Sequence, residues 1–529
     1  MIPSSVCRKF LARKLRDYRP WGKLTDAQIE HKQMRLRIRP PIWSKLKRHQ
    51  KVMVLLGAIK RRFYYTCDTG IGKTVTSIAL GRYHRVANKA RCFLVLVPNR
   101  INKAEWHLEI GKHSPDTKYV ILPSSIEGKW EALRNRDPDT LFVVETYSGF
   151  YRMVTKMVPA PRARKKKNKL KLDPKLMREI VATFDGLIMD ESNYAKNAKR
   201  VGRKVGSLPF RICRKISKTA RFVFGLTATP FGRDPTDLWG QLYIIDKGET
   251  LGPTLGLFRE ALFTASFNGF GTEWHFPKKN KPLVHRMLAN RSIRFTASAA
   301  DLPKVTHIIK EVELPQDAEV LYDQARQLMI DAKGNPAKRD QAFMRMRQIS
   351  SGFVGFTDDD TGEKAKVIFD ENPKLEMLLA IIESSCDQHK IVVPHEFIYS
   401  GQAICMELSK LGIGHLLLNG KTRDPQSVRM QFADDKSKRV LVLNSAAGGR
   451  GANLQAGSYI VFYELPVAVD LRYQVKRRVI RQHSEHERVF HYDLIAKNTA
   501  DRRILHNYRV GGDLFASIIE GRDIRKRRN

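Results

Sequence analysis

A short glycine-rich stretch of the chain contains the residue types that bind phosphate. Residues 67–74 read CDTGIGKT and lie between an apolar run and a helical pattern. In such a loop the backbone N–H groups point at the anion, a lysine reaches the β- and γ-phosphates, and a threonine ligates Mg²⁺. We therefore expect Lys73 to act on the phosphates and Thr74 to bind the metal. The residues expected to bind the nucleotide here are Thr69, Gly70, Ile71, Gly72, Lys73 and Thr74.

Two adjacent carboxylates further along the chain can act on the same nucleotide. Asp190 and Glu191 follow an apolar run that begins at residue 186. An acid at a strand tip can hold Mg²⁺, and its neighbour can orient or deprotonate the water that attacks ATP. We assign Asp190 to the metal and Glu191 to the water. A solvated surface pair is the alternative, and the position downstream of a phosphate loop argues against it.

Apolar strands that alternate with helical stretches would hold these residues. The expected strands of the first half cover residues 63–67, 93–97, 119–122, 141–144 and 186–190, and a further strand at 222–230 exits into small hydroxylated residues. Another strand begins at 391. Strands that are apolar throughout are typical of a parallel sheet covered on both faces. The sequence therefore predicts an α/β fold.

Three further polar residues stand where they could serve the nucleotide. Gln50 precedes the phosphate loop, and a glutamine can bond an adenine edge through both of its amide functions. Thr227 and Thr229 follow the strand that begins at residue 222 and could bond the carboxylates, coupling the nucleotide to the outer surface. An ordinary surface glutamine and a tight packed turn are the alternatives.

Composition points to a large, basic protein that binds a polyanion. The chain has 529 residues, 42 % of them hydrophobic, and a net charge of +41, which favours nucleic acid as the partner. A membrane surface is the weaker alternative because no apolar run is long enough to span a bilayer. The six cysteines form no C-x-x-C pair, which fits a reducing compartment, so we expect a cytoplasmic protein.

Two basic segments lie outside this alternation of strands and helices. Residues 1–44 are rich in Arg and Lys, and either a solvated arm or a contact to a phosphate backbone fits their composition. Residues 159–175 combine proline with many lysines, and we expect an exposed insertion there rather than a regular element.

The order of these motifs resembles that of superfamily 2 helicases. Residues 46–50, 70–74, 190–191 and 226–230 match the first motor domain of that superfamily. Residues 184–197 and the Asp-Leu-Trp at 237–239 resemble the Swi/Snf type of double-stranded DNA translocases, as do VLVLNSAAGGRGANL at 440–454 and QVKRRVIR at 474–481. The phosphate loop has the general superfamily form, and Asn193 replaces the usual histidine. The chain thus looks like a compact, divergent member, bacterial or phage-like.

The resemblance implies two tandem RecA-like, parallel-sheet P-loop motor domains with helical insertions. The expected divisions are a basic arm at 1–44, motor domain 1 at 45–250, a helical linker at 251–370, motor domain 2 at 371–510 and a basic tail at 511–529. In the second motor it implies nucleotide contacts from Gly449, Gln474, Arg478 and Arg481. The two arginines are three apart, so we expect them to share a helix face and point together at the γ-phosphate. A basic surface helix is the alternative. The implied coupling residues are Asn193, Thr227 and Thr229.

The implied function is that of an ATP-dependent DNA translocase or helicase, which hydrolyses ATP with Mg²⁺ between two motor domains. We expect a monomeric motor that contacts duplex or branched DNA through its backbone, and no membrane. An RNA helicase of the same superfamily is one alternative. A nucleic-acid-binding ATP switch that acts as the partner of a nuclease is the other.

Overall fold

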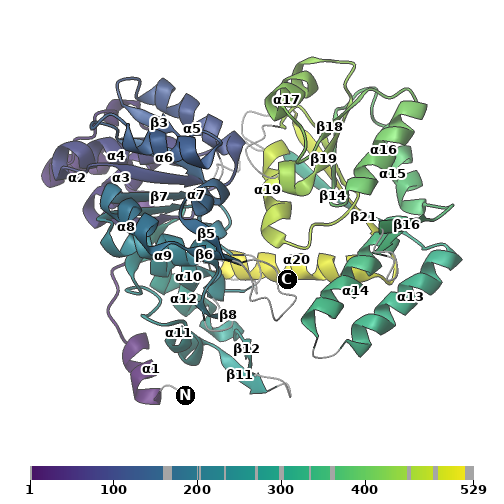
Figure 1. Cartoon of the computed structure of the whole chain (residues 1–529), viewed down its shortest axis with the longest axis horizontal. Helices are drawn as coiled ribbons and strands as arrows, with labels where there is room; N and C mark the ends of the chain where they lie inside the picture. Colours follow the sequence, from purple (N-terminus) through teal and green to yellow (C-terminus); the bar gives the residue numbers. More distant parts are fainter. Residues whose placement is uncertain are drawn as a thin grey trace. The chain divides into compact units, whose positions relative to one another are not determined.

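Two α/β units make up the part of the chain that the structure describes. The computed structural model describes residues 3–518 except 69, 159–168, 199, 202–203, 232–233, 268–271, 297–302, 333–334, 358–363, 449–453 and 481–485. The chain divides into Met1–Ala297 with Asp513–Asn529, and Ser298–Gly512. Each unit is built on one parallel sheet with helices on both faces (Figure 1), so the predicted fold class is confirmed.

The sheet of the first unit has the strand order β13-β1-β10-β7-β2-β4-β3, and all of its pairs are parallel. Its strands are β1 (Arg62–Tyr65), β2 (Phe93–Val97), β3 (Tyr119–Ile121), β4 (Phe142–Thr146), β7 (Gly186–Asp190), β10 (Phe222–Leu226) and β13 (Ser292–Ile293). The strands predicted from apolar runs are all present, and only β13 was not expected. Because β10 lies between β1 and β7, the segments that follow these three strands are neighbours.

Alternate residues of these strands pack into two separate cores. Phe63 and Tyr65 of β1 belong to the core on one face, and Tyr64 belongs to the core on the other. The first face is covered by α3 (Arg48–Lys60), α4 (Lys73–Asn88) and α5 (Arg100–His113). The other face is covered by α6 (Ile126–Arg134), α7 (Tyr147–Met153), α8 (Pro174–Thr183), α9 (Leu208–Thr219), α10 (Thr236–Asp246), α11 (Leu255–Leu262) and α12 (Lys281–Leu288). Of these helices, α8 to α12 are labelled below β7 in Figure 1. Burial on both faces is why most positions of these strands are apolar.

The basic N-terminal segment is folded onto the first unit. It forms α1 (Ser4–Leu11), η1 (Arg19–Lys23), α2 (Asp26–Leu36) and η2 (Trp43–Lys45). Tyr18, Ile29, Ile38 and Ile42 are buried in the same core as α3 and α4. Sparse apolar residues therefore anchor this segment, although its composition allowed a solvated arm.

Short antiparallel hairpins project from the sheet of the first unit. They are β5 (Thr155–Val158) with β6 (Lys169–Leu172), β8 (Arg200–Val201) with β9 (Lys204–Val205), and β11 (Thr264–Phe267) with β12 (Thr272–His275). The expectation that residues 159–175 contain no regular element is wrong at their C-terminal end, where β6 and the start of α8 lie. Asp173 caps α8 by accepting bonds from the N–H groups of Lys175 and Leu176. Residues 159–168 lie outside the described part.

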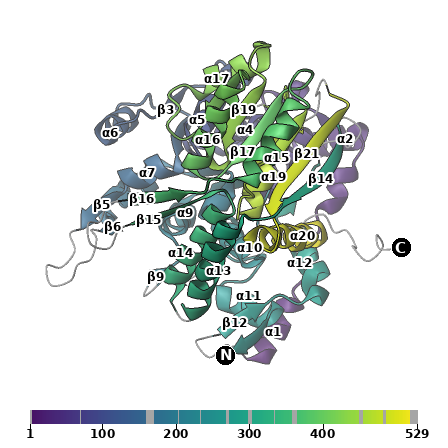
Figure 2. The ribbon, with the colours of Figure 1, turned by 90° about the vertical axis from the view of Figure 1, so that its right-hand side faces the viewer.

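The sheet of the second unit has the strand order β14-β21-β20-β17-β19-β18, again with parallel pairs throughout. Figure 2 shows β14 beside β21. The strands are β14 (Lys304–Val312), β17 (Ile391–His395), β18 (His415–Leu418), β19 (Val440–Asn444), β20 (Tyr459–Phe462) and β21 (Arg488–Ala496). Its helices are α15 (Pro373–Glu383), α16 (Ile398–Lys410), α17 (Pro425–Asp434), α18 (Ser445–Gly448), α19 (Val469–Val479) and α20 (Ala500–Ile518).

The region expected to be a helical linker contributes strands to both sheets. It does contain the predicted helices, α13 (Gln316–Asp331) and α14 (Pro336–Ile349), and also the hairpin of β15 (Phe353–Thr357) and β16 (Lys364–Ile368). However, β13 and β14 come from the same region and pair with β1 and β21. Among the described residues, the structure has no helix with the length and apolar character needed to cross a membrane.

Candidate nucleotide-binding site

Three neighbouring strands bring the predicted catalytic motifs to one edge of the first sheet. The register pairs Tyr65 with Leu226 and Leu226 with Asp190. The phosphate loop follows β1, and Glu191 follows β7. The loop with Thr227 and Thr229, called the threonine loop below, follows β10. Because these strands are parallel, their carboxyl ends meet at the same edge, where ligands of open α/β sheets bind.

Glycine is required at two positions of the phosphate loop. Gly70 and Gly72 have φ angles of 81° and 83°, in the left-handed region that side chains other than glycine rarely adopt. A β-carbon on Gly72 would also clash with the side-chain amide of Gln50. The loop can therefore turn sharply from β1 into α4 with its N–H groups exposed to an anion.

Gln50 ties the phosphate loop to the start of α3. Its Oε1 accepts a bond from Lys47 N at 2.9 Å, and its Nε2 donates to Ile71 O at 3.0 Å. The amide is 7 % exposed. The amide oxygen and the amide nitrogen, which we expected to bind adenine, thus both bond to the backbone in this structure. Recognition of the base stays a prediction, and it requires Gln50 to exchange one of these bonds for a bond to adenine.

Lys73 lies at the base of the loop with its ammonium group held by carbonyl oxygens. Its Nζ donates to Cys67 O at 3.0 Å and to Asp68 O at 2.7 Å. Burial lowers the pKa of Lys73, while the carboxylates of Glu191 and Asp190 oppose that shift. A phosphate group can take the place of these carbonyls as the partner of the ammonium. Thr74 is half-buried in the first turn of α4, and Thr69 lies outside the described residues.

The carboxylate pair at the end of β7 is held by side chains from other elements. Trp106 of α5 donates its indole N–H to Asp190 Oδ2 at 3.0 Å. Burial, and secondarily the charge of Glu191, raises the pKa of Asp190 to about 6. The Asp190 carboxylate and the Thr74 hydroxyl are hard oxygen donors of the kind that Mg²⁺ prefers, so the donor set fits this metal.

The loop after β10 contacts the carboxylate assigned to the water. Thr227 Oγ1 donates to Glu191 Oε2 at 2.9 Å and accepts a bond from Thr229 N at 3.1 Å. Glu191 has a φ of 49°, an unusual value for a residue with a side chain, so its conformation depends on such contacts. Within the described residues, the buried Thr229 Oγ1 has no hydrogen-bond partner. Asn193 is buried in η3 (Ser192–Ala195), and its coupling role stays a prediction.

Gln241 of α10 connects these motifs and was not found from the sequence. Its Oε1 accepts bonds at 2.8 Å from the hydroxyls of Tyr64 and Ser192. Its Nε2 donates to the carbonyls of Pro230 and Asp237. The amide is fully buried and uses all four of its hydrogen-bonding positions. It therefore joins β1, the residue after Glu191 and the end of the threonine loop.

Replacement of Gln241 by leucine is expected to lower the free energy of unfolding by about 3 kcal/mol, because buried hydroxyls and carbonyls lose their partner. We also expect kcat for ATP to fall about tenfold, since Ser192 adjoins Glu191. Urea unfolding and steady-state ATPase assays measure the two effects. Gln324→Leu, on an exposed position of α13, is the matched control. Unchanged stability of Gln241→Leu would contradict the role of this amide.

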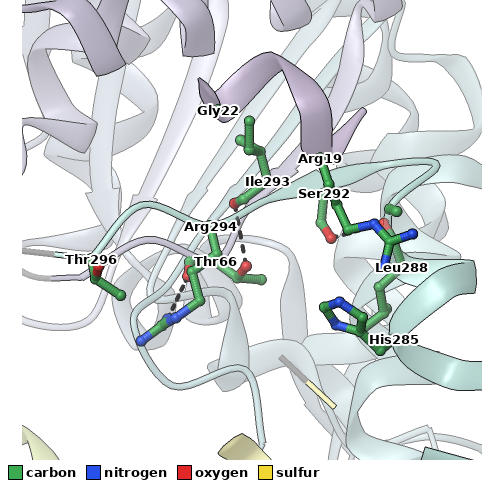
Figure 3. A pocket seen from close by; sticks show the side chains of 10 residues that line it. Arg19, Gly22, Thr66, His285, Leu288, Ser292, Ile293, Arg294 and Thr296 are labelled. Atoms are coloured by element: carbon green, nitrogen blue, oxygen red, sulfur yellow. Dashed lines mark hydrogen bonds between the residues drawn. The ribbon is translucent and has the colours of Figure 1, made fainter. Parts of the chain in front are cut away.

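A cavity of about 350 Å³ adjoins the base of the phosphate loop (Figure 3). Arg294 lines it and donates to Thr66 O at 2.7 Å and to Asp68 Oδ1 at 2.8 Å. Asp68 N also donates to Phe295 O at 3.0 Å. The segment after β13 thus stabilises the phosphate loop, although the two lie more than 220 residues apart in the chain. No local sequence pattern indicates this contact.

In the second unit, α19 contains two of the four predicted nucleotide contacts. Gln474 is 8 % exposed, and Arg478 is half-buried in the last turn. Arg478 O accepts a bond from Leu454 N at 2.9 Å, while its Nε has no partner within the described residues. The helix ends at Val479, so the expected helix face shared with Arg481 does not form within α19. Arg481 and Gly449 lie outside the described part.

One family model and several known proteins match this chain. The family model of the SNF2-related domain matches residues 66–354. A SWI/SNF-related matrix-associated actin-dependent regulator of chromatin subfamily A-like protein 1 from Xenopus tropicalis is 22 % identical over 454 residues, which are 82 % of this chain and 40 % of that protein. Putative protein p41 of Acyrthosiphon pisum secondary endosymbiont phage 1 is 23 % identical over 455 residues, 82 % of this chain and 89 % of p41.

A solved structure, the Sulfolobus solfataricus SWI2/SNF2 ATPase core in complex with dsDNA, is 17 % identical, with a TM-score of 0.37 over 91 % of this chain and 93 % of that one. The chain spans less than half the length of the Xenopus protein that it matches. The family model, by contrast, covers more than half of this chain and includes the phosphate loop, the carboxylate pair and the threonine loop. The protein belongs to the SNF2-related domain family.

Proposed function

We propose that this protein is an ATP-dependent DNA translocase or helicase. The observation that supports this proposal most directly is the meeting of Lys73, Asp190 and Glu191 at one edge of the first sheet. A phosphate-binding lysine, a metal-binding acid and a water-orienting acid are the parts that ATP hydrolysis requires. The hydrogen bond from Thr227 to Glu191 adds a contact through which the state of the nucleotide can reach the rest of the domain.

The first unit would bind ATP and Mg²⁺ through the phosphate loop and the end of β7. The N–H groups of residues 70–74 and the Lys73 ammonium would hold the phosphates, while Thr74 and Asp190 would hold the metal. Bound Mg²⁺ supplies positive charge that neutralises the phosphates. Glu191, restrained by Thr227, would accept a proton from the attacking water or orient it.

The second unit would supply positive charge to the same nucleotide. Arg478 and Arg481 are the residues that we assign to the γ-phosphate, with Gly449 and Gln474 as further contacts. Charge placed where it develops in the transition state lowers the barrier to hydrolysis. Because hydrolysis would then require arginines of the second unit, the rate of ATP turnover would depend on the ligand that the second unit binds.

We propose DNA as the polymer that this protein binds, because of its net charge and its family. The net charge of +41 suits contacts to a phosphate backbone, which are independent of base sequence and weaken steeply with salt. Duplex or branched DNA is the form that we propose, bound by a monomer. An RNA helicase and an ATP switch without sustained turnover are the competing functions.

ATPase activity measured with single-stranded, duplex and forked DNA and with RNA tests this proposal. We expect duplex or forked DNA to stimulate turnover most, and the stimulation to fall as salt rises from 50 to 200 mM, about the range over which phosphate contacts weaken. Greater stimulation by RNA would indicate an RNA helicase. Binding of ATP and DNA without turnover under any condition would indicate a switch.

A further inference from the structure

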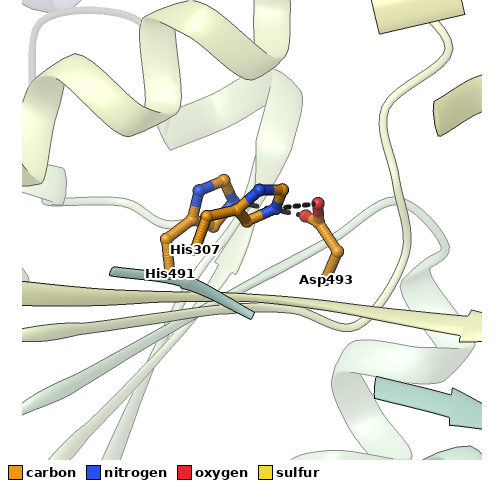
Figure 4. A group of neighbouring side chains, drawn as sticks. All are labelled: His307, His491 and Asp493. Atoms are coloured by element: carbon orange, nitrogen blue, oxygen red, sulfur yellow. Dashed lines mark hydrogen bonds and ion pairs between the residues drawn. The ribbon is translucent and has the colours of Figure 1, made fainter. Parts of the chain in front are cut away.

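A cluster of charged side chains is buried in the second unit, next to the helix that contains Gln474 and Arg478. At its centre is Asp493 of β21, which is fully buried. Arg472 of α19 donates to Asp493 Oδ2 at 2.6 Å, and His307 Nε2 lies 2.7 Å from the same oxygen. His491 Nε2 lies 3.2 Å from Oδ1. Figure 4 shows the two imidazoles and the carboxylate turned toward one another.

The sheet itself brings these residues together. His491 and Asp493 are two residues apart on β21, so their side chains lie on the same face. The parallel register places His307 of β14 opposite His491, and the two imidazole rings stack with centroids 4.6 Å apart. Arg472 reaches the group from α19, which covers this face.

Two imidazoles and a carboxylate are also a ligand set for transition metals. Here, however, Arg472 Nη2 lies 3.3 Å from His491 Nε2 as well as 2.6 Å from Asp493 Oδ2. A permanently charged guanidinium therefore contacts two of the three side chains that would ligate a cation. Lys476 lies nearby, and burial together with the charge of Arg472 lowers its pKa to about 8. A divalent ion would add charge beside these cations in a poorly solvated site, so the arginine is the partner of this carboxylate.

Aromatic side chains fix the same guanidinium in place. Its central carbon lies 4.2 Å from the ring centroid of Tyr508 and 5.4 Å from that of Phe462. The Tyr508 hydroxyl in turn donates to Pro466 O, in the segment that leads into α19. One tyrosine of α20 thus contacts both Arg472 and the chain that enters the helix. The N-terminal half of α19 is held from the sheet and from α20.

We propose that the ion pair of Arg472 and Asp493 is a positioning device for ATP turnover. Arg472 and Arg478 are six residues apart on one helix, about 9 Å along its axis, so the pair sets the orientation in which α19 presents Arg478. Neither Arg472 nor Asp493 touches the nucleotide in this assignment. The inference rests on the proposed function, since it concerns the same ATPase reaction.

The test replaces the ion pair by apolar residues and separates turnover from stability. The variant Arg472→Met/Asp493→Leu removes both charges, a change that is often neutral for stability because no buried charge is left unpaired. We expect its Tm to stay within about 3 °C of the wild type. We expect kcat for ATP to fall at least about tenfold while KM changes less than about twofold, because a misplaced Arg478 affects the transition state more than binding.

Two further variants define what the result means. Arg472→Lys keeps the charge without the planar fork, and we expect kcat between those of the wild type and the double variant. Arg503→Met, at an exposed position of α20, is the matched control and should behave as the wild type. Wild-type kcat in a stable double variant overturns this inference alone. A wild type that never hydrolyses ATP overturns the proposed function and, with it, the inference.

A zinc titration checks the alternative occupant of the cluster. We expect equimolar ZnCl₂ to leave the Tm of the wild type unchanged, because Arg472 already pairs with the carboxylate. A zinc-dependent rise in Tm that disappears in His307→Ala would overturn the assignment and identify a metal site.

Discussion

Replacement of Lys73 by alanine is expected to reduce ATP hydrolysis at least about a hundredfold while DNA binding persists. The ammonium of Lys73 is the group of the phosphate loop that can follow charge as it develops on the γ-phosphate. Among the described residues it is held by the carbonyls of Cys67 and Asp68, which a phosphate can displace. Gln50, Arg294 and the two glycines with positive φ hold the loop by contacts that the substitution leaves intact. The loss of activity should therefore occur in a folded protein.

Three measurements on the same preparation distinguish the expected result from a folding defect. They are the Tm, the affinity for duplex DNA at fixed salt, and kcat for ATP at saturating DNA. Lys112→Ala is the matched control, since Lys112 lies on the exposed surface of α5 in the same unit and its loss changes the net charge equally. Hydrolysis that survives in Lys73→Ala would show that the phosphate-loop assignment is wrong. A parallel loss of DNA affinity would contradict our expectation that the DNA-binding surface is separate from the ATP site.

Six of the seven strands of the first sheet were predicted, because burial on two faces leaves a largely apolar run, whereas in the second sheet only β17 was predicted as a strand. The runs at 93–97 and 186–190 match β2 and β7, and the predicted stretch at 222–230 contains β10. The strand β14 was not predicted, because most of its side chains are exposed and its sequence KVTHIIKEV therefore lacks a continuous apolar run. The strand β13 escaped because it is only two residues long. Strands at the edge of a sheet and very short strands lack the long apolar run by which a buried strand is recognised.

The catalytic motifs could be predicted because each one is a local string at the end of a strand. The residues that hold those motifs in place could not, because their contacts join positions far apart in the chain. Gln241 meets Tyr64 across 177 positions, and Arg294 meets Asp68 across 226. Neither residue type is rare, and neither stands in a recognisable pattern. Only the fold shows that the Gln241 amide is buried with all of its hydrogen-bonding positions used, and that Arg294 binds the phosphate loop.

Arg478→Ala is expected to leave ATP binding nearly intact and to lower turnover at least about a hundredfold. The family resemblance assigns this residue to the γ-phosphate, and its position in α19 supports that role. Arg478 is half-buried, yet its Nε has no partner within the described residues, whereas Arg472 of the same helix is committed to Asp493. A guanidinium with unused donors can bind a phosphate without first breaking an ion pair. Equilibrium binding of a nucleotide analogue and single-turnover hydrolysis measure the two effects separately.

The alternative for Arg478, a basic surface helix, predicts a different pattern among neighbouring variants. Arg477→Ala removes the same charge one residue away, on a face of α19 rotated by about 100°. If the helix acts only through its net charge, the two variants should lose the same activity and regain it as salt is lowered. If Arg478 acts on the γ-phosphate, its loss should be far larger than that of Arg477 and independent of salt, because a phosphate contact in a closed site is poorly screened. Equal losses of binding and turnover in Arg478→Ala would instead assign the residue to structure.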